Sequence, residues 1–408
     1  MATLRSRLRR LTLPASLLLP VLLLTGCISD DSKPMNIFRP EGEQSRKINS
    51  LHPWVFGIAG IVFVFVTGAV FWLVFKNRVN GDELDPEDLP AQVHGNTRLE
   101  ISWTIFPAVL LAVLAVPTVA TVWSLEEKEP DALPVMVVGQ QWWWEYRYDV
   151  DGDGFFEGDA PAAGDVQHGS TKFDKDDLVV ANELVIPAGR RIELTITSRD
   201  IIHSFWIPRL NGKRDAVPGR FHPWSIEADK PGKFVGWCTE FCGLSHARMR
   251  ISAIALPPDQ WQQWYDNQLK PAETPTDEAA AAGQATFVAQ CATCHVVRNP
   301  DIEYPPDFLS AQVSGAAPNL THFATRSVFA GAIYSQYRGV EPNDDDLDVS
   351  GYLDLAENGS FNEAQLKAWI HNAPSQKDMA PPDRGMPAFP GLTEQDLDNL
   401  VAYLATLD

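Results

Sequence analysis

Two long uncharged runs dominate the hydropathy pattern of the first third of the chain. Residues 54–75 contain no charged side chain, and residues 101–123 form a second run of the same kind. About 20 consecutive apolar residues are enough for a helix to cross a bilayer. Pro107 and Pro117 interrupt the second run, which transmembrane helices tolerate. The pattern predicts a two-helix transmembrane hairpin within residues 28–130, with both of its ends on one side of the membrane.

The first 27 residues have the pattern of an export signal. Four arginines precede an apolar core at residues 11–24, which is too short for a confident membrane span. The ending Leu24-Thr-Gly-Cys27 resembles a bacterial lipoprotein signal and implies cleavage before Cys27 and lipidation of its thiol. Ordinary secretory cleavage nearby is the alternative. Lys and Arg around the two spans show little asymmetry, so only export of the N-terminus predicts that both ends of the hairpin are periplasmic or extracellular.

Beyond residue 130 the pattern changes to that of strands. Apolar and polar residues alternate in Arg191-Ile-Glu-Leu-Thr-Ile-Thr197, which is typical of a strand with one solvated face. Several such runs predict a small β-sandwich over residues 131–269. Residues 270–278 are rich in Pro, Thr and acidic side chains and predict a linker. Residues 279–408 then form a further domain.

One stretch of the predicted sandwich concentrates ligands for a soft metal. Cys238, Cys242, His246 and Met249 lie within twelve residues. Thiolate and thioether donors favour copper over magnesium, calcium or manganese, and methionine is unusual in structural zinc sites. His203, near the end of another predicted strand, offers a further imidazole. A disulfide, a zinc knuckle or buried free cysteines are the alternatives.

The last domain begins with a motif for covalent heme attachment, Cys291-Ala-Thr-Cys294-His295. The two thiols would add to the heme vinyl groups and His295 would ligate the iron. A thioredoxin-like cysteine pair or half of a zinc site are the alternatives. A Met/His ligand pair raises the heme potential and suits electron transfer. The candidates for the second axial ligand, in order of preference, are Met386, Met379, and then His322 or His371.

Three stretches of the predicted sandwich, H-S-F-W-I-P, K-R-D-A-V-P-G-R and C-T-E-F-C-G-L-S-H-A-R-M, resemble subunit II of the heme-copper cytochrome c oxidases. The resemblance implies a cupredoxin fold that holds the binuclear copper centre CuA. Residues 279–408 resemble an all-α class I cytochrome c. Quinol oxidases of the same superfamily lack the copper ligands. The implied ligands are thiolates of Cys238 and Cys242, imidazoles of His203 and His246, the thioether of Met249 and the backbone carbonyl of Glu240.

The same resemblance implies roles for three further residues. Trp142, the first of three consecutive tryptophans, would accept electrons from cytochrome c, although aromatic clusters more often serve packing. Glu100, at the start of the second span, would lie at the mouth of a proton channel in the catalytic subunit; a carboxylate at the level of the lipid headgroups is the alternative. The side chain of Glu240 would reach a magnesium ion at the border with that subunit.

The charge of the chain bears on its partners. The formal net charge of −20 argues against nucleic acid binding. Residues 279–408 carry 6 Lys and Arg against 17 Asp and Glu, a net charge of −11. The acidic run at residues 344–348 predicts a solvated loop, and an acidic surface would attract a basic donor cytochrome with an on-rate that falls as salt rises.

Together these features predict a multidomain membrane protein with a transmembrane hairpin, a cupredoxin-like β-sandwich and an all-α cytochrome c domain. The resemblance implies the electron-accepting subunit of a bacterial cytochrome c oxidase. Electrons would pass from cytochrome c through heme c and CuA to a catalytic subunit that reduces oxygen to water and translocates protons. Its location would be the bacterial inner membrane, with CuA and heme on the periplasmic side. A subunit of a CuA-type nitric oxide reductase, or a membrane-tethered copper and heme electron shuttle, are the alternatives.

Overall fold

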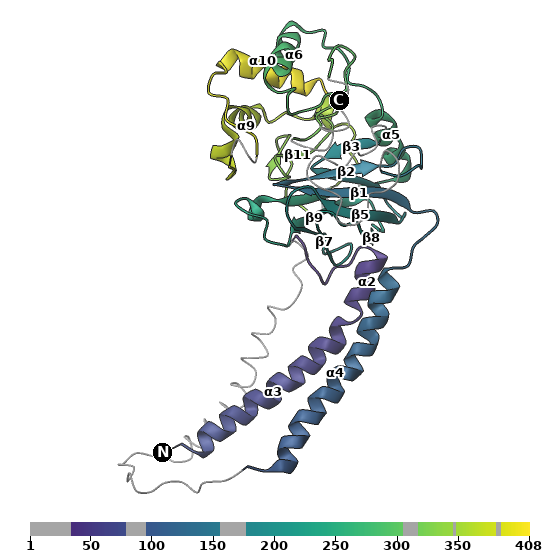
Figure 1. The fold of residues 1–408 in the computed structure, drawn as a ribbon, viewed down its shortest axis with the longest axis vertical. Helices are drawn as coiled ribbons and strands as arrows, with labels where there is room; N and C mark the ends of the chain where they lie inside the picture. The colour runs from purple at the N-terminus through teal and green to yellow at the C-terminus, as the bar shows by residue number, and fades with distance from the viewer. Residues whose placement is uncertain (1–33, 79–94, 156–176, 305–316, 346–347, 381–384) are drawn as a thin grey trace, which may run out of the picture.

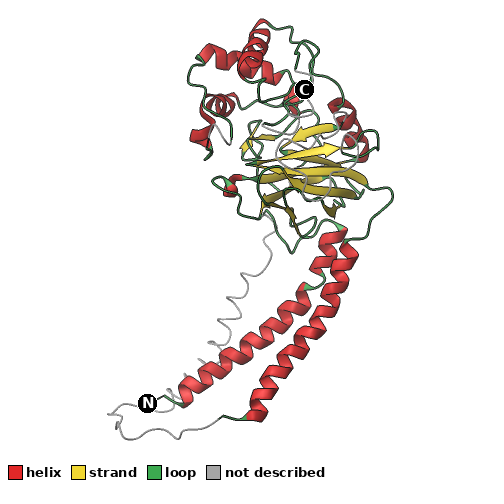
Figure 2. Ribbon diagram, viewed as in Figure 1, coloured by secondary structure: helices red, strands yellow, loops and turns green. Residues whose placement is uncertain are grey.

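The computed structural model describes residues 34–78, 95–155, 177–304, 317–345, 348–380 and 385–408. The predicted signal segment and Cys27 lie outside these residues. Figure 1 shows three layers along the long axis of the molecule: a helical hairpin, a β-sandwich, and a group of helices on the side of the sandwich away from the hairpin. Figure 2 shows that strands are concentrated in the middle layer.

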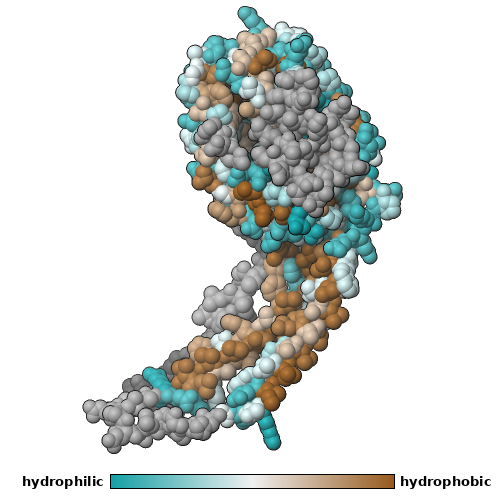
Figure 3. Space-filling view, in the orientation of Figure 1, coloured by the Kyte–Doolittle hydropathy of each residue, from teal (hydrophilic) through white to brown (hydrophobic). Residues whose placement is uncertain are grey.

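The hairpin consists of two long helices, α3 (His52–Lys76) and α4 (Thr97–Leu125). Both are long and apolar enough to cross a membrane, and almost all of their side chains are exposed. Figure 3 shows hydrophobic side chains along both helices. The Asn96 side chain caps the start of α4 by accepting hydrogen bonds from the Arg98 and Leu99 amides. The predicted spans are therefore confirmed as helices, and each helix extends beyond the uncharged run at both ends.

A short helix, α2 (Glu43–Asn49), joins the hairpin to the sandwich. Glu43 accepts a hydrogen bond of 2.6 Å from the guanidinium of Arg191 in the sandwich. Lys47 donates a 3.3 Å hydrogen bond to the carbonyl of Ser124, near the end of α4. Through α2, these contacts connect the sandwich to the last turn of α4.

The sandwich consists of two five-stranded sheets, ordered β3-β2-β1-β5-β8 and β4-β10-β9-β6-β7. Their facing apolar side chains form one core. In β5 (Ile192–Ser198), Ile192, Leu194 and Ile196 are buried, as the alternation predicts. The prediction of a solvated opposite face is wrong, because Glu193 and Thr195 are half-buried and Thr197 is buried. The other strands are β1 (Leu133–Gln140), β2 (Trp143–Tyr148), β3 (Leu178–Ala181), β4 (Glu183–Pro187), β6 (His203–Trp206), β7 (Lys213–Ala216), β8 (His222–Ile226), β9 (Gly232–Cys238) and β10 (Arg250–Leu256).

The helix α5 (Pro258–Gln268) follows the last strand and packs its tryptophans, Trp261 and Trp264, against the sandwich core. The cytochrome part is built mainly from α6 (Glu278–Gln290), α9 (Glu363–Gln376) and α10 (Glu394–Ala405), with short elements between them. Those elements are β11 (Val328–Phe329), β12 (Tyr334–Ser335) and α8 (Leu355–Asn358). The fold class expected from the sequence is thus confirmed.

The helices α6 and α10 cross at very close range. A Cβ atom at Gly283 of α6 would lie 1.9 Å from the carbonyl oxygen of Asn399 in α10, so only glycine fits there. The apolar stripe of α10, which includes Leu397 and Leu404, is buried. Thr393 caps α10 by accepting a hydrogen bond from the Asp396 amide.

Residues 341–345 and 348–355 belong to an extension of the cytochrome part that packs against the sandwich; we call these residues the docking arm. Asp345 is 6 % exposed and accepts a hydrogen bond from the Val235 amide of β9. The Arg209 guanidinium donates to the Asp345 carbonyl over 2.8 Å. Val349 and Tyr352 belong to the sandwich core. The prediction of a solvated acidic loop is therefore wrong at Asp345, because Arg209 and the β9 backbone give that carboxylate buried partners.

A second buried carboxylate, that of Glu183, also joins the sandwich to the cytochrome part. Glu183, 2 % exposed at the start of β4, accepts hydrogen bonds from the Ser327 amide over 2.8 Å and from the Tyr352 hydroxyl over 2.9 Å. The cytochrome part is consequently held to the sandwich by buried polar contacts as well as by the linker.

The buried contacts of Asp345 lead to a first prediction. The substitution Asp345→Ala should lower the free energy of unfolding by ~3 kcal/mol, because it leaves the Arg209 charge and the Val235 amide without this partner. Chemical denaturation of the full chain in detergent, followed by tryptophan fluorescence, measures the change. Glu357→Ala removes an exposed carboxylate next to the docking arm and serves as the control. Equal losses in the two variants would contradict a specific role for Asp345.

Candidate copper and heme sites

The predicted copper ligands lie on a loop between β9 and β10. Cys238 is the last residue of β9, and Met249 precedes β10. The Cys238 amide donates to the Met249 carbonyl over 3.0 Å, which closes the base of the loop. The next amide, of Thr239, donates to the Ser204 carbonyl in β6, also over 3.0 Å. Strand pairing thus places the loop beside His203, the first residue of β6.

The two cysteines lie at the centre of the site, and neither forms a disulfide. Their Sγ atoms are 3.7 Å apart, well beyond an S–S bond of about 2.0 Å. Each thiol has an imidazole Nδ1 beside it: His203 is 3.8 Å from Cys238 Sγ and His246 is 3.5 Å from Cys242 Sγ. The other two potential donors approach one sulfur each: the Glu240 carbonyl at 3.3 Å from Cys238 Sγ and the Met249 Sδ at 3.9 Å from Cys242 Sγ.

The structure therefore brings together all six potential donor groups that the sequence suggested. Thiol, imidazole and thioether groups around two central sulfurs fit a soft metal such as copper. The hydrogen bond from the Cys242 thiol, with a further contribution from His203, lowers the pKa of Cys238 to about 4. The hydrogen bond between the two thiols, together with burial, raises the pKa of Cys242. The pair thus gives up its first proton more readily than an ordinary cysteine, and metal binding would displace any proton that remains.

Asp200 fixes the orientation of His203, a role that we did not predict. Its Oδ1 lies 2.8 Å from His203 Nε2, so the ring presents Nδ1 to Cys238. Burial acts to raise the pKa of Asp200, but hydrogen bonding to His203 is among the interactions that lower it overall. Carboxylates commonly fix metal-binding histidines in this way. The signal in the sequence was the D-I-I-H spacing.

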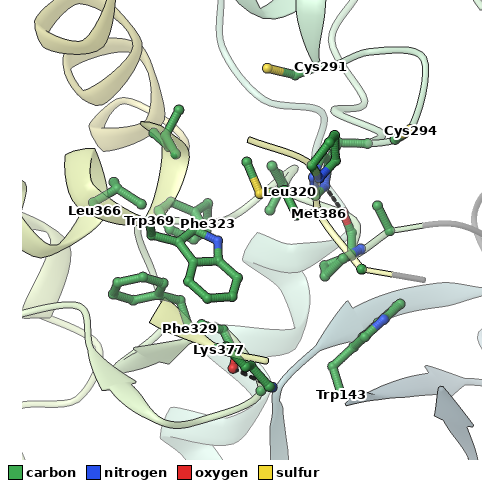
Figure 4. Close-up of a pocket in the computed structure, with 18 of the residues that line it drawn as sticks. Trp143, Cys291, Cys294, Leu320, Phe323, Phe329, Leu366, Trp369, Lys377 and Met386 are labelled. Atoms are coloured by element: carbon green, nitrogen blue, oxygen red, sulfur yellow. Dashed lines mark hydrogen bonds between the residues drawn. The ribbon is translucent and has the colours of Figure 1, made fainter. Parts of the chain in front are cut away.

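The heme-attachment motif lines a cavity of about 320 Å³. Cys291, Cys294 and His295 lie along one side of it, and Figure 4 shows the two cysteines and Met386 facing this space. His295 Nδ1 is 2.8 Å from the Pro318 carbonyl, which leaves Nε2 for a metal. Most of the remaining lining is apolar: Phe287, Leu320, Phe323, Phe329, Leu366, Ile370, Leu400 and Leu404. An apolar cavity with two free thiols and an oriented imidazole fits a covalently bound heme.

The cavity also narrows the choice of a second axial ligand. Met386 and Met379 both line it. Both ring nitrogens of His322 lie within hydrogen-bond distance of backbone carbonyls, those of Asp408 and Lys270, so that side chain is not available. His371 is not among the residues that line the cavity. Met386 and Met379 remain as candidates.

Part of the cavity lining comes from the sandwich. Trp142 and Trp143 line it together with Gln141 and Asn182. The indole Nε1 of Trp142 donates a 2.8 Å hydrogen bond to the carbonyl of Cys242. Trp142 is only 4 % exposed, because the cytochrome part covers it. It therefore lies between the heme cavity and the copper loop and is not presented to a soluble cytochrome.

The other two predicted residues lie at the surface. The Glu240 side chain is exposed beside Phe241, which is 76 % exposed. Glu100 lies in the first turn of α4, at the end of the hairpin away from the sandwich (Figure 1), and its Oε1 accepts a 3.2 Å hydrogen bond from the Asn96 amide. Neither contact tests the proposed magnesium or proton-channel role, and both roles stay predictions.

Comparison with known proteins shows matches over most of the chain. Residues 36–121 match the transmembrane domain of cytochrome c oxidase subunit II, residues 133–256 match its periplasmic domain, and residues 280–408 match cytochrome c. "Cytochrome c oxidase subunit 2" of Alkalihalophilus pseudofirmus is 31 % identical over 403 residues, covering 97 % of this chain and 96 % of the relative. The chain belongs to the cytochrome c oxidase subunit 2 family. The corresponding protein of Bacillus sp. strain PS3 is 30 % identical over 82 % of this oxidase subunit and 80 % of its own length.

A solved structure overlaps part of this oxidase subunit. The periplasmic domain of subunit II of cytochrome oxidase from Bradyrhizobium japonicum is 31 % identical, with 35 % of this chain and 96 % of that one covered and a TM-score of 0.27. As a cytochrome c oxidase subunit 2 with a C-terminal cytochrome c domain, the protein is a membrane-bound part of an oxidoreductase complex. The two families imply a CuA copper centre and a heme c.

The position of Asp200 generates a second prediction. In this oxidase subunit, Asp200→Ala should weaken copper binding by roughly 10- to 100-fold, because His203 loses the carboxylate that orients it. A chelator competition titration on the heme-containing full chain measures the affinity. Asp215→Ala removes an exposed carboxylate from β7, the neighbouring strand, and should leave affinity unchanged. Unchanged copper affinity in Asp200→Ala would show that the hydrogen bond does not support the site.

Proposed function

We propose that this oxidase subunit takes electrons from a donor cytochrome c at its own heme c and delivers them, through CuA, to a heme-copper catalytic subunit. The observation that carries the proposal is the position of Trp142. It lines the heme cavity, and its indole donates a hydrogen bond to the Cys242 carbonyl. A single side chain thus contacts both candidate redox sites.

The proposed copper ligands are the six groups around the two thiols: Cys238, Cys242, His203, His246, Met249 and the carbonyl of Glu240. The proposed heme site consists of Cys291 and Cys294 as attachment points, His295 as one axial ligand and Met386 as the other. When bound, both groups supply reversible one-electron chemistry.

The protein contributes rigidity and exclusion of water. Backbone hydrogen bonds close the copper loop, and Asp200 holds His203. A site whose ligands are already fixed needs little rearrangement when its charge changes. Trp142, nearly fully buried, fills the space between the loop and the heme cavity. Electron transfer between the sites would therefore proceed through packed protein.

The finer parts of the proposal concern the surroundings. We place the sandwich and the cytochrome part on the periplasmic side, with Cys27 lipidated, as the signal-like N-terminus suggests. Glu240 would contribute to an interfacial magnesium site, and Glu100 to a proton entrance of the catalytic subunit. Proton translocation would belong to that subunit. The net charge of −11 over residues 279–408 supports a basic cytochrome as the external donor.

The metal content tests the proposal directly. The purified full chain should hold two coppers per heme, because the two cysteine sulfurs are close enough to bridge a pair of ions. Metal analysis gives the ratio, and electron paramagnetic resonance should show one unpaired electron shared between two coppers. A single copper, zinc, or a localised copper signal would contradict the CuA assignment.

The axial ligand is tested by a matched pair of substitutions. In Met386→Ala, the methionine–iron charge-transfer absorption should disappear and the heme potential should fall, because the thioether ligand raises that potential. Met379→Ala should retain the absorption band. Redox titration followed by visible absorption measures both quantities. Loss of the band in Met379→Ala alone would assign the ligand to that residue instead.

A further inference from the structure

A buried lysine lies where the heme cavity meets the sandwich. Lys377, 2 % exposed, directly follows α9 and lines the heme cavity. Its ammonium donates to the Trp142 carbonyl over 2.7 Å and to the Ala330 carbonyl over 2.9 Å. One carbonyl belongs to the sandwich and the other to the cytochrome part. Burying an ammonium is costly unless fixed acceptors replace its hydration, so these two contacts define its position.

The backbone on either side of Lys377 is held by the copper loop itself. The Arg248 guanidinium donates to the Gln376 carbonyl over 2.6 Å. The Ser245 hydroxyl donates to the Asp378 carbonyl, also over 2.6 Å. Both donors flank His246. Residues 376–378 are thus attached to the copper loop and to Trp142 simultaneously.

The loop that carries Ala330 leaves no spare room beside this contact. Ala330, Gly331 and Ala332 all have positive φ, and the Gly331 amide donates to the Asn182 side chain over 3.1 Å. A Cβ atom at Gly331 would lie 2.5 Å from both Lys377 Nζ and the Trp142 carbonyl oxygen. A Cβ atom at this position would therefore have to displace the Lys377 ammonium, the Trp142 carbonyl, or both.

We propose that Lys377 is a positioning residue for the electron step between heme c and CuA, an inference that rests on the function proposed above. In that step one electron leaves the reduced heme and one electron reduces the oxidised copper centre. Lys377 holds the backbone of Trp142 against the heme cavity, while the indole of the same residue stays bonded to Cys242. The side chain thereby fixes the separation of the two sites, and whenever its amine is protonated the positive charge favours the reduced form of both.

The test uses the intact oxidase complex carrying Lys377→Met, which keeps the length of the side chain and removes its charge and hydrogen bonds. Heme c is reduced by a light pulse, and its reoxidation is followed together with the reduction of copper. We expect the transfer rate to fall about tenfold, because small displacements of a preorganised site have large kinetic effects. The midpoint potentials of heme and copper should also fall. The affinity of the complex for external cytochrome c should be unchanged, because Lys377 is buried.

Two further variants separate position from charge. Lys367→Met changes a lysine within α9 that pairs with Asp398 and is partly exposed, and it should behave as the wild type. Gly331→Ala keeps the ammonium but pushes it away from the Trp142 carbonyl. It should slow transfer while leaving the potentials in place. Amide hydrogen exchange around residues 330–332 and 376–378 should accelerate in both junction variants, even in protein without copper.

The outcomes are distinguishable. If Lys377→Met and Gly331→Ala both transfer electrons at the wild-type rate, Lys377 has no positioning role, and the proposed function stands. If both variants only unfold at lower temperature and the folded protein transfers normally, the role is structural and the inference fails. If Lys377→Met does not load its cofactors, the transfer rate of Gly331→Ala decides whether Lys377 has a positioning role. If the wild-type heme never reduces copper, the proposed function itself is wrong.

Discussion

Both candidate redox sites are bounded by the same few residues, and this shared boundary constrains the rest of the structure. The Trp142 indole donates to the Cys242 carbonyl in the copper loop, and the Trp142 carbonyl accepts a hydrogen bond from Lys377, which lines the heme cavity. Any shift of the cytochrome part relative to the sandwich would change both sites at once. The many buried contacts between these parts, remote from the cofactor sites, maintain that single arrangement.

Several of those contacts are hydrogen bonds to buried carboxylates. Glu183 and Asp345 are nearly inaccessible, yet each has several hydrogen-bond donors from the opposite part of the chain. A buried charge that loses its partner is strongly destabilising, whereas apolar surfaces can slide with little loss. The hydrogen bonds consequently favour a single alignment of the cytochrome part on the sandwich. The apolar side chain of Val349 adds burial without determining that alignment.

The sequence was sufficient for features that depend on neighbouring residues. The two spans, the buried apolar positions of β5 and both cysteine motifs could all be predicted because each is a local pattern. Asp345 was misjudged because its partners, Arg209 and Val235, are more than 100 residues away in the sequence. Lys377 was not noticed for the same reason, since the Trp142 carbonyl is 235 positions from it. Asp200 differs: it is only three residues from His203, and an acid beside a histidine is too common to single out.

The docking arm changes what fusion of a cytochrome to an oxidase subunit accomplishes. A donor on a flexible tether would raise the effective concentration of heme near copper and would still have to search for its place. Here the docking arm holds the cytochrome part against the sandwich. Electron transfer from heme to copper within the chain is therefore first-order and needs no diffusional encounter. Such a step involves buried groups and should be insensitive to the ionic strength that governs meetings between separate proteins. The only diffusional event left to this chain is the arrival of an outside reductant.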